Sequence, residues 1–141
     1  MGAIGMTLPL VMCAPEPTPE EAVREVIRQT ALACEERRLG DAIAAISETY
    51  RDEDGLGKQQ LYGLLFREFA RDGGLGVALG PIRVEIEGPE ATAYFVAALG
   101  ESSGIMGLPD EVDALEFQVA LALEDSNWMI TWHSRAPVFR R

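Results

Sequence analysis

Few side chains in this sequence are of the types that carry acid–base or nucleophilic chemistry, and they lie far apart. His133 is the only histidine, Cys13 and Cys34 are the two cysteines, and Asp52 follows Tyr50 in an acidic turn. Ser–His–Asp and Cys–His mechanisms need a nucleophile and a base within hydrogen-bond reach of each other. The sequence offers no such pair at recognisable spacing, so we find no complete catalytic constellation.

Spacing typical of metal ligands is also missing. Residues 52–57 resemble a calcium loop only superficially, because they lack the ligand spacing and the closing glutamate of that motif. Neither cysteine has a partner at metal-ligand spacing, and Cys34 is expected to be a small buried thiol in a helix. We therefore interpret residues 52–57 as a solvated turn, and we predict neither a metal nor a cofactor.

The first half of the chain has the period of helices. Thr18 is suited to cap a helix, Pro19 to its first position, and Glu21 completes a capping box. Apolar residues then recur at helical spacing, interrupted near Gly40 and Gly55. The pattern predicts three helices, over residues 18–38, 41–46 and 58–71.

The second half alternates with a period of two, which is typical of strands with one buried face. The pattern predicts four strands, over residues 82–87, 91–99, 115–124 and 128–137. Helices followed by such a meander predict an α+β fold. We expect a curved four-stranded antiparallel sheet with the three N-terminal helices packed on its concave face.

Strict alternation also assigns each strand residue to a face. The face that carries Phe95, Phe117 and Trp132 is expected to meet the helices. His133 then falls on the opposite face, where a lone histidine is usually inert. That opposite face is only moderately polar, which is typical of a covered surface. We therefore predict a homodimer through it, with three residues near the centre: Tyr94, Ala120 and Met129.

The net charge of −11 and the pI near 4.5 argue against a nucleic-acid partner. Phosphate binding needs clustered Lys and Arg, whereas the basic residues here are scattered.

The N-terminal residues 1–17 consist of an apolar, uncharged stretch that ends at Cys13, followed by a Pro-rich tether. This stretch resembles a bacterial lipoprotein signal. It predicts lipidation of Cys13 and a periplasmic or lipid-anchored location, and a cytoplasmic location is the alternative. The remaining residues, 18–141, are predicted to form a single domain.

The order of elements and three local features resemble the nuclear transport factor 2-like superfamily, also called SnoaL-like or cone-shaped α+β proteins. The three features are residues 40–43, which open the second helix, residues 50–55 before the third helix, and the last strand, 128–132. The resemblance implies a pocket between sheet and helices but no particular reaction. In ketosteroid isomerases of this superfamily the general base is an Asp at about the position of Asp52. The phenol that would complete their oxyanion hole corresponds to the region of Ala33, which has no donor.

The resemblance and the residues together favour a non-catalytic domain that binds a small apolar ligand or a protein partner. The alternatives are an isomerase- or cyclase-like enzyme with Asp52 as general base, and a dimeric interaction module with a filled cone. The enzyme needs Asp52 to face an open cavity with a hydrogen-bond donor opposite. The expected pocket residues are Tyr50, Asp52, Phe66, Phe69, Phe95, Phe117 and Trp132.

Overall fold

The computed structural model describes residues 2, 5, 15–71, 74–102 and 109–138. The lipidation predicted at Cys13 lies outside these residues and stays a prediction. Within the described part, no helix is long and apolar enough to cross a membrane.

Three helices form as predicted: α1 (Pro19–Glu35), α2 (Leu39–Ala44) and α3 (Lys58–Ala70). The predicted cap of α1 is confirmed, because the backbone N–H of Glu21 donates to the Thr18 hydroxyl oxygen at 3.2 Å. The Gln60 side chain accepts the N–H of Gly57 at the start of α3. These local contacts satisfy backbone donors that a helix start leaves without partners.

The sheet has five antiparallel strands rather than the four predicted: β1 (Gly74–Leu79), β2 (Arg83–Glu87), β3 (Glu90–Ser102), β4 (Pro109–Glu124) and β5 (Asn127–Pro137). The main order is β1-β3-β4-β5, and β2 pairs with the first half of β3 while β1 pairs with its second half. The prediction missed β1 because its glycine-rich sequence lacks the apolar–polar alternation of the other strands.

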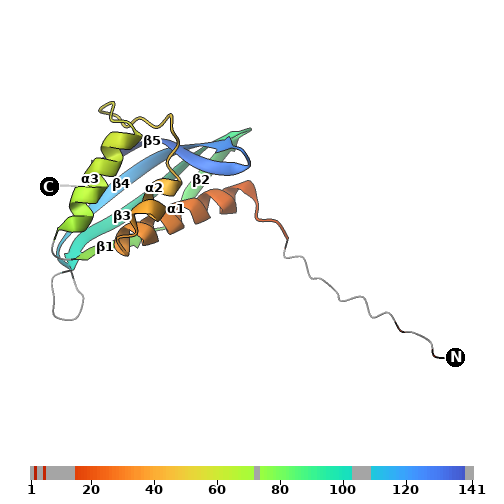
Figure 1. Cartoon of the computed structure of the whole chain (residues 1–141), viewed down its shortest axis with the longest axis horizontal. Coiled ribbons are helices and arrows are strands. Elements are labelled where there is room, and N and C mark those ends of the chain that lie inside the picture. Colours follow the sequence, from red (N-terminus) through yellow and green to blue (C-terminus); the bar gives the residue numbers. More distant parts are fainter. Residues whose placement is uncertain (1, 3–4, 6–14, 72–73, 103–108, 139–141) are drawn as a thin grey trace.

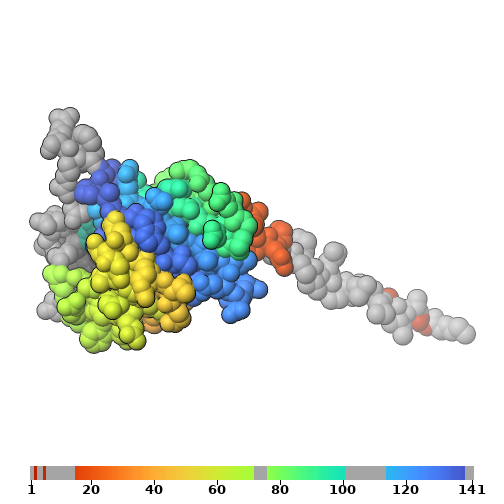
Figure 2. All heavy atoms as spheres, turned by 90° about the horizontal axis from the view of Figure 1, so that it is seen from above, coloured from red at the N-terminus to blue at the C-terminus, as the bar shows by residue number. Residues whose placement is uncertain are grey.

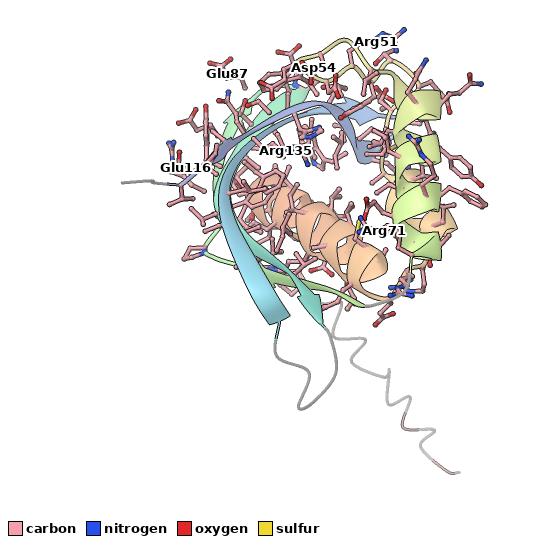
Figure 3. All side chains as sticks on the ribbon, turned by 90° about the vertical axis from the view of Figure 1, so that its left-hand side faces the viewer. Arg51, Asp54, Arg71, Glu87, Glu116 and Arg135 are labelled. Carbon is pink, nitrogen blue, oxygen red and sulfur yellow. The ribbon has the colours of Figure 1, made fainter. Side chains whose placement is uncertain are left out.

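All three helices cover one face of the curved sheet (Figure 1). Seen along the sheet, the strands bend around α1, and α3 stands across from them (Figure 3). The α+β class and the placement of helices on the concave face are therefore confirmed. The concave face is called the inner face below, and the opposite one the outer face.

The fully packed core fills one end of the space between helices and sheet. Its buried side chains come from α1, the α2–α3 segment, the chain before β2, and the parts of β3, β4 and β5 nearest the β4–β5 turn: Val23, Ile27, Ile46, Tyr50, Ile82, Ala91, Ala93, Val119, Leu121, Trp128 and Ile130. Towards the other end, inner-face residues such as Phe95 and Phe117 are only half-buried. Every residue of α3 is described and none is buried. The molecule is therefore closed at one end and less tightly packed at the other.

A β-bulge reverses the predicted faces of the last strand. Ile130 pairs with Leu121 and Trp132 pairs with Ala120, so Thr131 is an extra residue in β5. One extra residue moves all later side chains to the opposite face. Trp132 therefore lies on the outer face with Ala120, whereas His133 pairs with Val119 on the inner face. The placements predicted for these two residues are both wrong.

The outer face carries the residues predicted to form the homodimer. Tyr94, Ala120 and Met129 are half-buried there, and Val96 is 39% exposed. A hollow of about 530 Å³ crosses this face between β2 and β5, with Arg83, Glu116 and Gln118 among its lining residues. The homodimer stays a prediction, for which light scattering at micromolar concentration is the measurement.

Two leucines near the C-terminal end of β4 offer a matched test of the core. Leu121 is 2% exposed and Leu123, two residues further on, is 43% exposed. We expect Leu121→Ala to lower the free energy of unfolding by about 2–5 kcal/mol, because it leaves a cavity in the core. Leu123→Ala should lower it by less than about 1 kcal/mol. Denaturant unfolding of both variants checks this, and equal losses would contradict the described core.

Candidate functional site

Four rings lie side by side across the inner face, and we call them the aromatic row: Phe95, Phe117, His133 and Tyr50. The ring centroids of Phe95 and Phe117 are 5.3 Å apart, those of Phe117 and His133 are 6.4 Å apart, and those of His133 and Tyr50 are 5.9 Å apart. Neighbouring planes differ by at most 24°. The row runs from β3 through β4 and β5 to the α2–α3 segment, and it presents a largely flat, apolar wall.

Tyr50 reaches the row because the α2–α3 segment is bonded to the edge of β5. The Ile130 N–H donates to the carbonyl oxygen of Ala45 (2.7 Å), and the Ser47 N–H donates to the carbonyl oxygen of Ile130 (2.8 Å). The Arg51 N–H donates to the carbonyl oxygen of Thr131, the bulge residue, at 3.1 Å. Figure 2 shows this segment in yellow against β5 in blue. Tyr50 is thus fixed beside the strand that carries His133.

The Tyr50 hydroxyl and His133 Nδ1 form a short hydrogen bond. Burial, and then the charge of Asp52, raise the pKa of Tyr50, with Arg135 acting in the opposite direction. The phenol therefore keeps its proton near neutral pH. Burial, and then the charge of Arg135, lower the pKa of His133, while Asp52 and Glu53 act to raise it. The imidazole is therefore neutral near pH 7.

The bond between these two groups has one consistent proton arrangement. Tyr50 is 1% exposed, and His133 is the only hydrogen-bond partner of its hydroxyl among the described residues. A buried hydroxyl proton needs an acceptor, and Nδ1 is the acceptor in reach. His133 then carries its proton on Nε2. The imidazole thus offers a hydrogen-bond donor at Nε2 rather than a basic lone pair.

Arg135 lies two residues beyond His133 on the same face of β5, and it pairs across the strands with Phe117. Figure 3 shows it on the inside of the curved sheet, on the side of α3. Its side chain is exposed, and within the described part of the chain it makes no hydrogen bond or ion pair. Its charge lowers the pKa of both Tyr50 and His133, and its pairing with Phe117 places it beside the row.

Asp52 is half-buried near the row and serves mainly to shape the turn before α3. Its Oδ1 accepts the backbone N–H groups of Asp54 (2.9 Å) and Leu56 (2.8 Å). Gly55 completes the turn with φ +83°, a conformation that favours glycine. This is the turn that the sequence of residues 52–57 predicts.

Of the other predicted pocket residues, some face the space between helices and sheet and others do not. Phe69 is half-buried on α3, on the same side as Leu61, which packs against the core. Phe66 is 58% exposed and lies away from that side. Trp132 is on the outer face because of the bulge. Ala33, the position where the resemblance would place a phenol, is 1% exposed. The structure therefore brings Tyr50, Asp52, Phe95 and Phe117 near one another but neither Phe66 nor Trp132.

Sequence reasoning missed His133 and Arg135 as inner-face residues. The run from Trp128 to Trp132 alternates without interruption, so nothing in it marks the bulge that places both residues inward. The inner face therefore carries a neutral hydrogen-bond donor at His133, a cation at Arg135 and the flat apolar wall of the aromatic row. Among the described residues, no three His, Cys, Asp or Glu side chains gather where they could hold a metal ion.

Comparison with known proteins identifies the fold. No family model and no curated protein matches the sequence. An NTF2-like protein of unknown function from Pseudomonas putida superposes with a TM-score of 0.71 at 16% identity, over 86% of this chain and 87% of that one. An NTF2-like superfamily protein from Salmonella enterica gives 0.71 at 12% identity, over 85% and 91%. Bdellovibrio bacteriovorus Bd1075 gives 0.74 at 8% identity, and the chain spans 41% of its length. The chain therefore has the NTF2-like fold, as the resemblance in its sequence implied.

The position of His133 predicts a particular pH dependence of stability. Its pKa is lower in the folded protein than the ordinary value of 6.5. Below pH 6.5 the unfolded chain therefore binds the proton more readily than the folded one. As the pH is lowered from 6.5, the free energy of unfolding decreases until the pH passes below the folded pKa. Above that window the histidine adds no slope. In His133→Gln, which cannot titrate, this part of the slope should disappear.

Denaturant unfolding of the wild type and His133→Gln between pH 7.5 and 5 checks this, because the carboxylates common to both proteins cancel in the difference. A difference in stability that stays constant over this range would show that the imidazole is not buried as described.

Proposed function

We propose that this protein is a binding domain for a small, largely apolar molecule, held against the aromatic row on the inner face of the sheet. The observation that carries the proposal is the row itself, with Arg135 beside it and donors at one end. A set of stacked rings with a few polar groups is the usual lining of a small-molecule site. Location in the cell envelope through Cys13 stays part of the proposal on the sequence alone.

The exposure of the site supports binding over a purely structural role. Phe95, Phe117 and His133 keep part of their surface in contact with solvent, and Arg135 is exposed. In a filled cone these side chains would be covered, as Val119 and Leu121 are at the packed end. Apolar surface left open next to unpaired polar groups gives a ligand contact area to cover.

A neutral fluorescent probe tests this proposal. We expect N-phenyl-1-naphthylamine to bind with a rise in fluorescence, because the row shields it from water. Phe117→Leu should weaken binding about fivefold, which corresponds to roughly 1 kcal/mol of lost apolar contact. Val96→Ala, on the outer face of β3, is the matched control and should leave binding unchanged. Equal effects of both variants, or no binding by the folded wild type, would count against the proposal.

An isomerase- or cyclase-like enzyme with Asp52 as general base is the second candidate. The specific observation in its favour is that Asp52 acts electrostatically on both Tyr50 and His133, and His133 offers the donor that this chemistry requires. Against it, Oδ1 of Asp52 is occupied by two backbone N–H groups. Proton exchange at the α-carbon of a bound ketosteroid that disappears in Asp52→Asn would make the enzyme the leading candidate.

A further inference from the structure

The proposed binding site has a polar end whose chemistry selects among apolar ligands. His133 and Arg135 are alternate residues of β5 on the inner face, so their Cα atoms are separated by roughly 7 Å. Both flank one ring, because the Phe117 ring stacks at 6.4 Å from that of His133 and Phe117 is the cross-strand partner of Arg135. A ligand that lies on Phe117 is therefore within reach of both.

Both side chains have N–H groups that donate no hydrogen bond to any described residue. Because the Tyr50 hydroxyl donates to Nδ1, the His133 proton is on Nε2, which has no hydrogen-bond partner among the described residues. Arg135 makes no ion pair there either, although the chain as a whole carries a net charge of −11. Of the other described arginines, five have a carboxylate within 4.0 Å, namely Arg24, Arg28, Arg38, Arg71 and Arg83. Arg37, Arg51 and Arg67 also have none within the described chain, but they are not on the inner face of the sheet. The exposed Arg135 guanidinium on the inner face is therefore available to bind an anion from outside.

From this arrangement we infer that the ligand is an aromatic carboxylate. Its ring lies against Phe95 and Phe117, and its carboxylate accepts hydrogen bonds from the Arg135 guanidinium and from Nε2 of His133. A guanidinium presents a planar fork that matches the two carboxylate oxygens, which a single alcohol oxygen does not. Asp52 and Glu53 repel an anion at the end of the row near Tyr50, and so favour a carboxylate placed at Arg135. The inference rests on the proposed function and adds the charge and chemical class of the ligand.

Competition against the neutral probe separates the two proposals. The compounds are 1-naphthoate and 1-naphthalenemethanol, which share a ring system and differ in the anionic group. We expect naphthoate to displace the probe at about tenfold lower concentration than the alcohol, the effect of one charge-assisted bidentate contact. Arg135→Gln should remove this preference, because the naphthoate concentration needed for displacement should rise about tenfold. Arg83→Gln, an exposed arginine on β2, is the matched control and should preserve the preference.

The outcomes are distinct. Equal displacement by both compounds overturns the carboxylate inference while the probe result still supports the binding domain. Loss of the preference in Arg83→Gln as well as in Arg135→Gln also overturns it, because the effect would then be one of overall charge. Failure of the probe itself to bind removes the proposed function and the inference together.

The donor role of His133 has its own readout, independent of ligand affinity. Because the chain has one histidine, its imidazole nitrogens give a single pair of signals in a ¹⁵N-histidine spectrum. We expect Nε2 protonated and Nδ1 unprotonated at pH 7.5, and a mixture of both forms in Tyr50→Phe, which removes the phenolic proton. Protonation on Nδ1 in the wild type would show that Nε2 is an acceptor, and would overturn its assigned contact with the carboxylate.

Discussion

The extra residue at Thr131 is the constraint on which the site depends. Without it, the alternation of β5 would place Trp132 against the helices and His133 in the outer face. With it, the buried Trp128 and Ile130 keep their place in the core, and the strand beyond them turns a histidine and an arginine inward. The bulge therefore separates two functions of one strand: packing near the β4–β5 turn, and polar chemistry further along.

The bulge is held in place by the segment that delivers Tyr50. The carbonyl oxygen of Thr131 accepts the Arg51 N–H at 3.1 Å, and the Thr131 hydroxyl donates to the Ala120 carbonyl oxygen at 3.2 Å. Ser47, 1% exposed, donates to the Glu124 carboxylate at 2.8 Å and ties the segment to the end of β4. These bonds satisfy groups that an edge strand and a bulge leave without ladder partners. The hydrogen bonding that stabilises the irregular strand thus also brings the phenol to the imidazole.

The sequence was a good guide wherever local physics decides the structure, and a poor one wherever a tertiary contact does. Helical period, the Thr18 cap and the turn at Asp52 follow from residue types and spacing alone, and each formed as expected. The breadth of the apolar stripe on α3 left Phe66 and Phe69 equally plausible as inward residues, and packing against the core near Leu61 chose Phe69. Trp128, Ile130 and Trp132 alternate so regularly that a bulge between them has no local cue. Because the predicted pocket depended on that alternation, it wrongly included Trp132 and missed His133 and Arg135, whereas its polar residues Tyr50 and Asp52 lie near the row.

A departure from local pattern at a polar site is itself informative. A strand that kept its alternation would have covered Trp132 with the helices and placed His133 and Arg135 on the outer face. The observed strand instead leaves a large indole on the outer face and brings a neutral imidazole and an unpaired guanidinium beside phenyl rings. Partial desolvation of the half-buried imidazole is unfavourable unless hydrogen-bond partners replace the water, whereas the Arg135 side chain stays exposed. The Tyr50 hydroxyl donates to Nδ1, whereas the donors at Nε2 and on the guanidinium have no acceptor within the described chain. These two donors and the half-exposed rings are the features on which the proposed aromatic-carboxylate site depends.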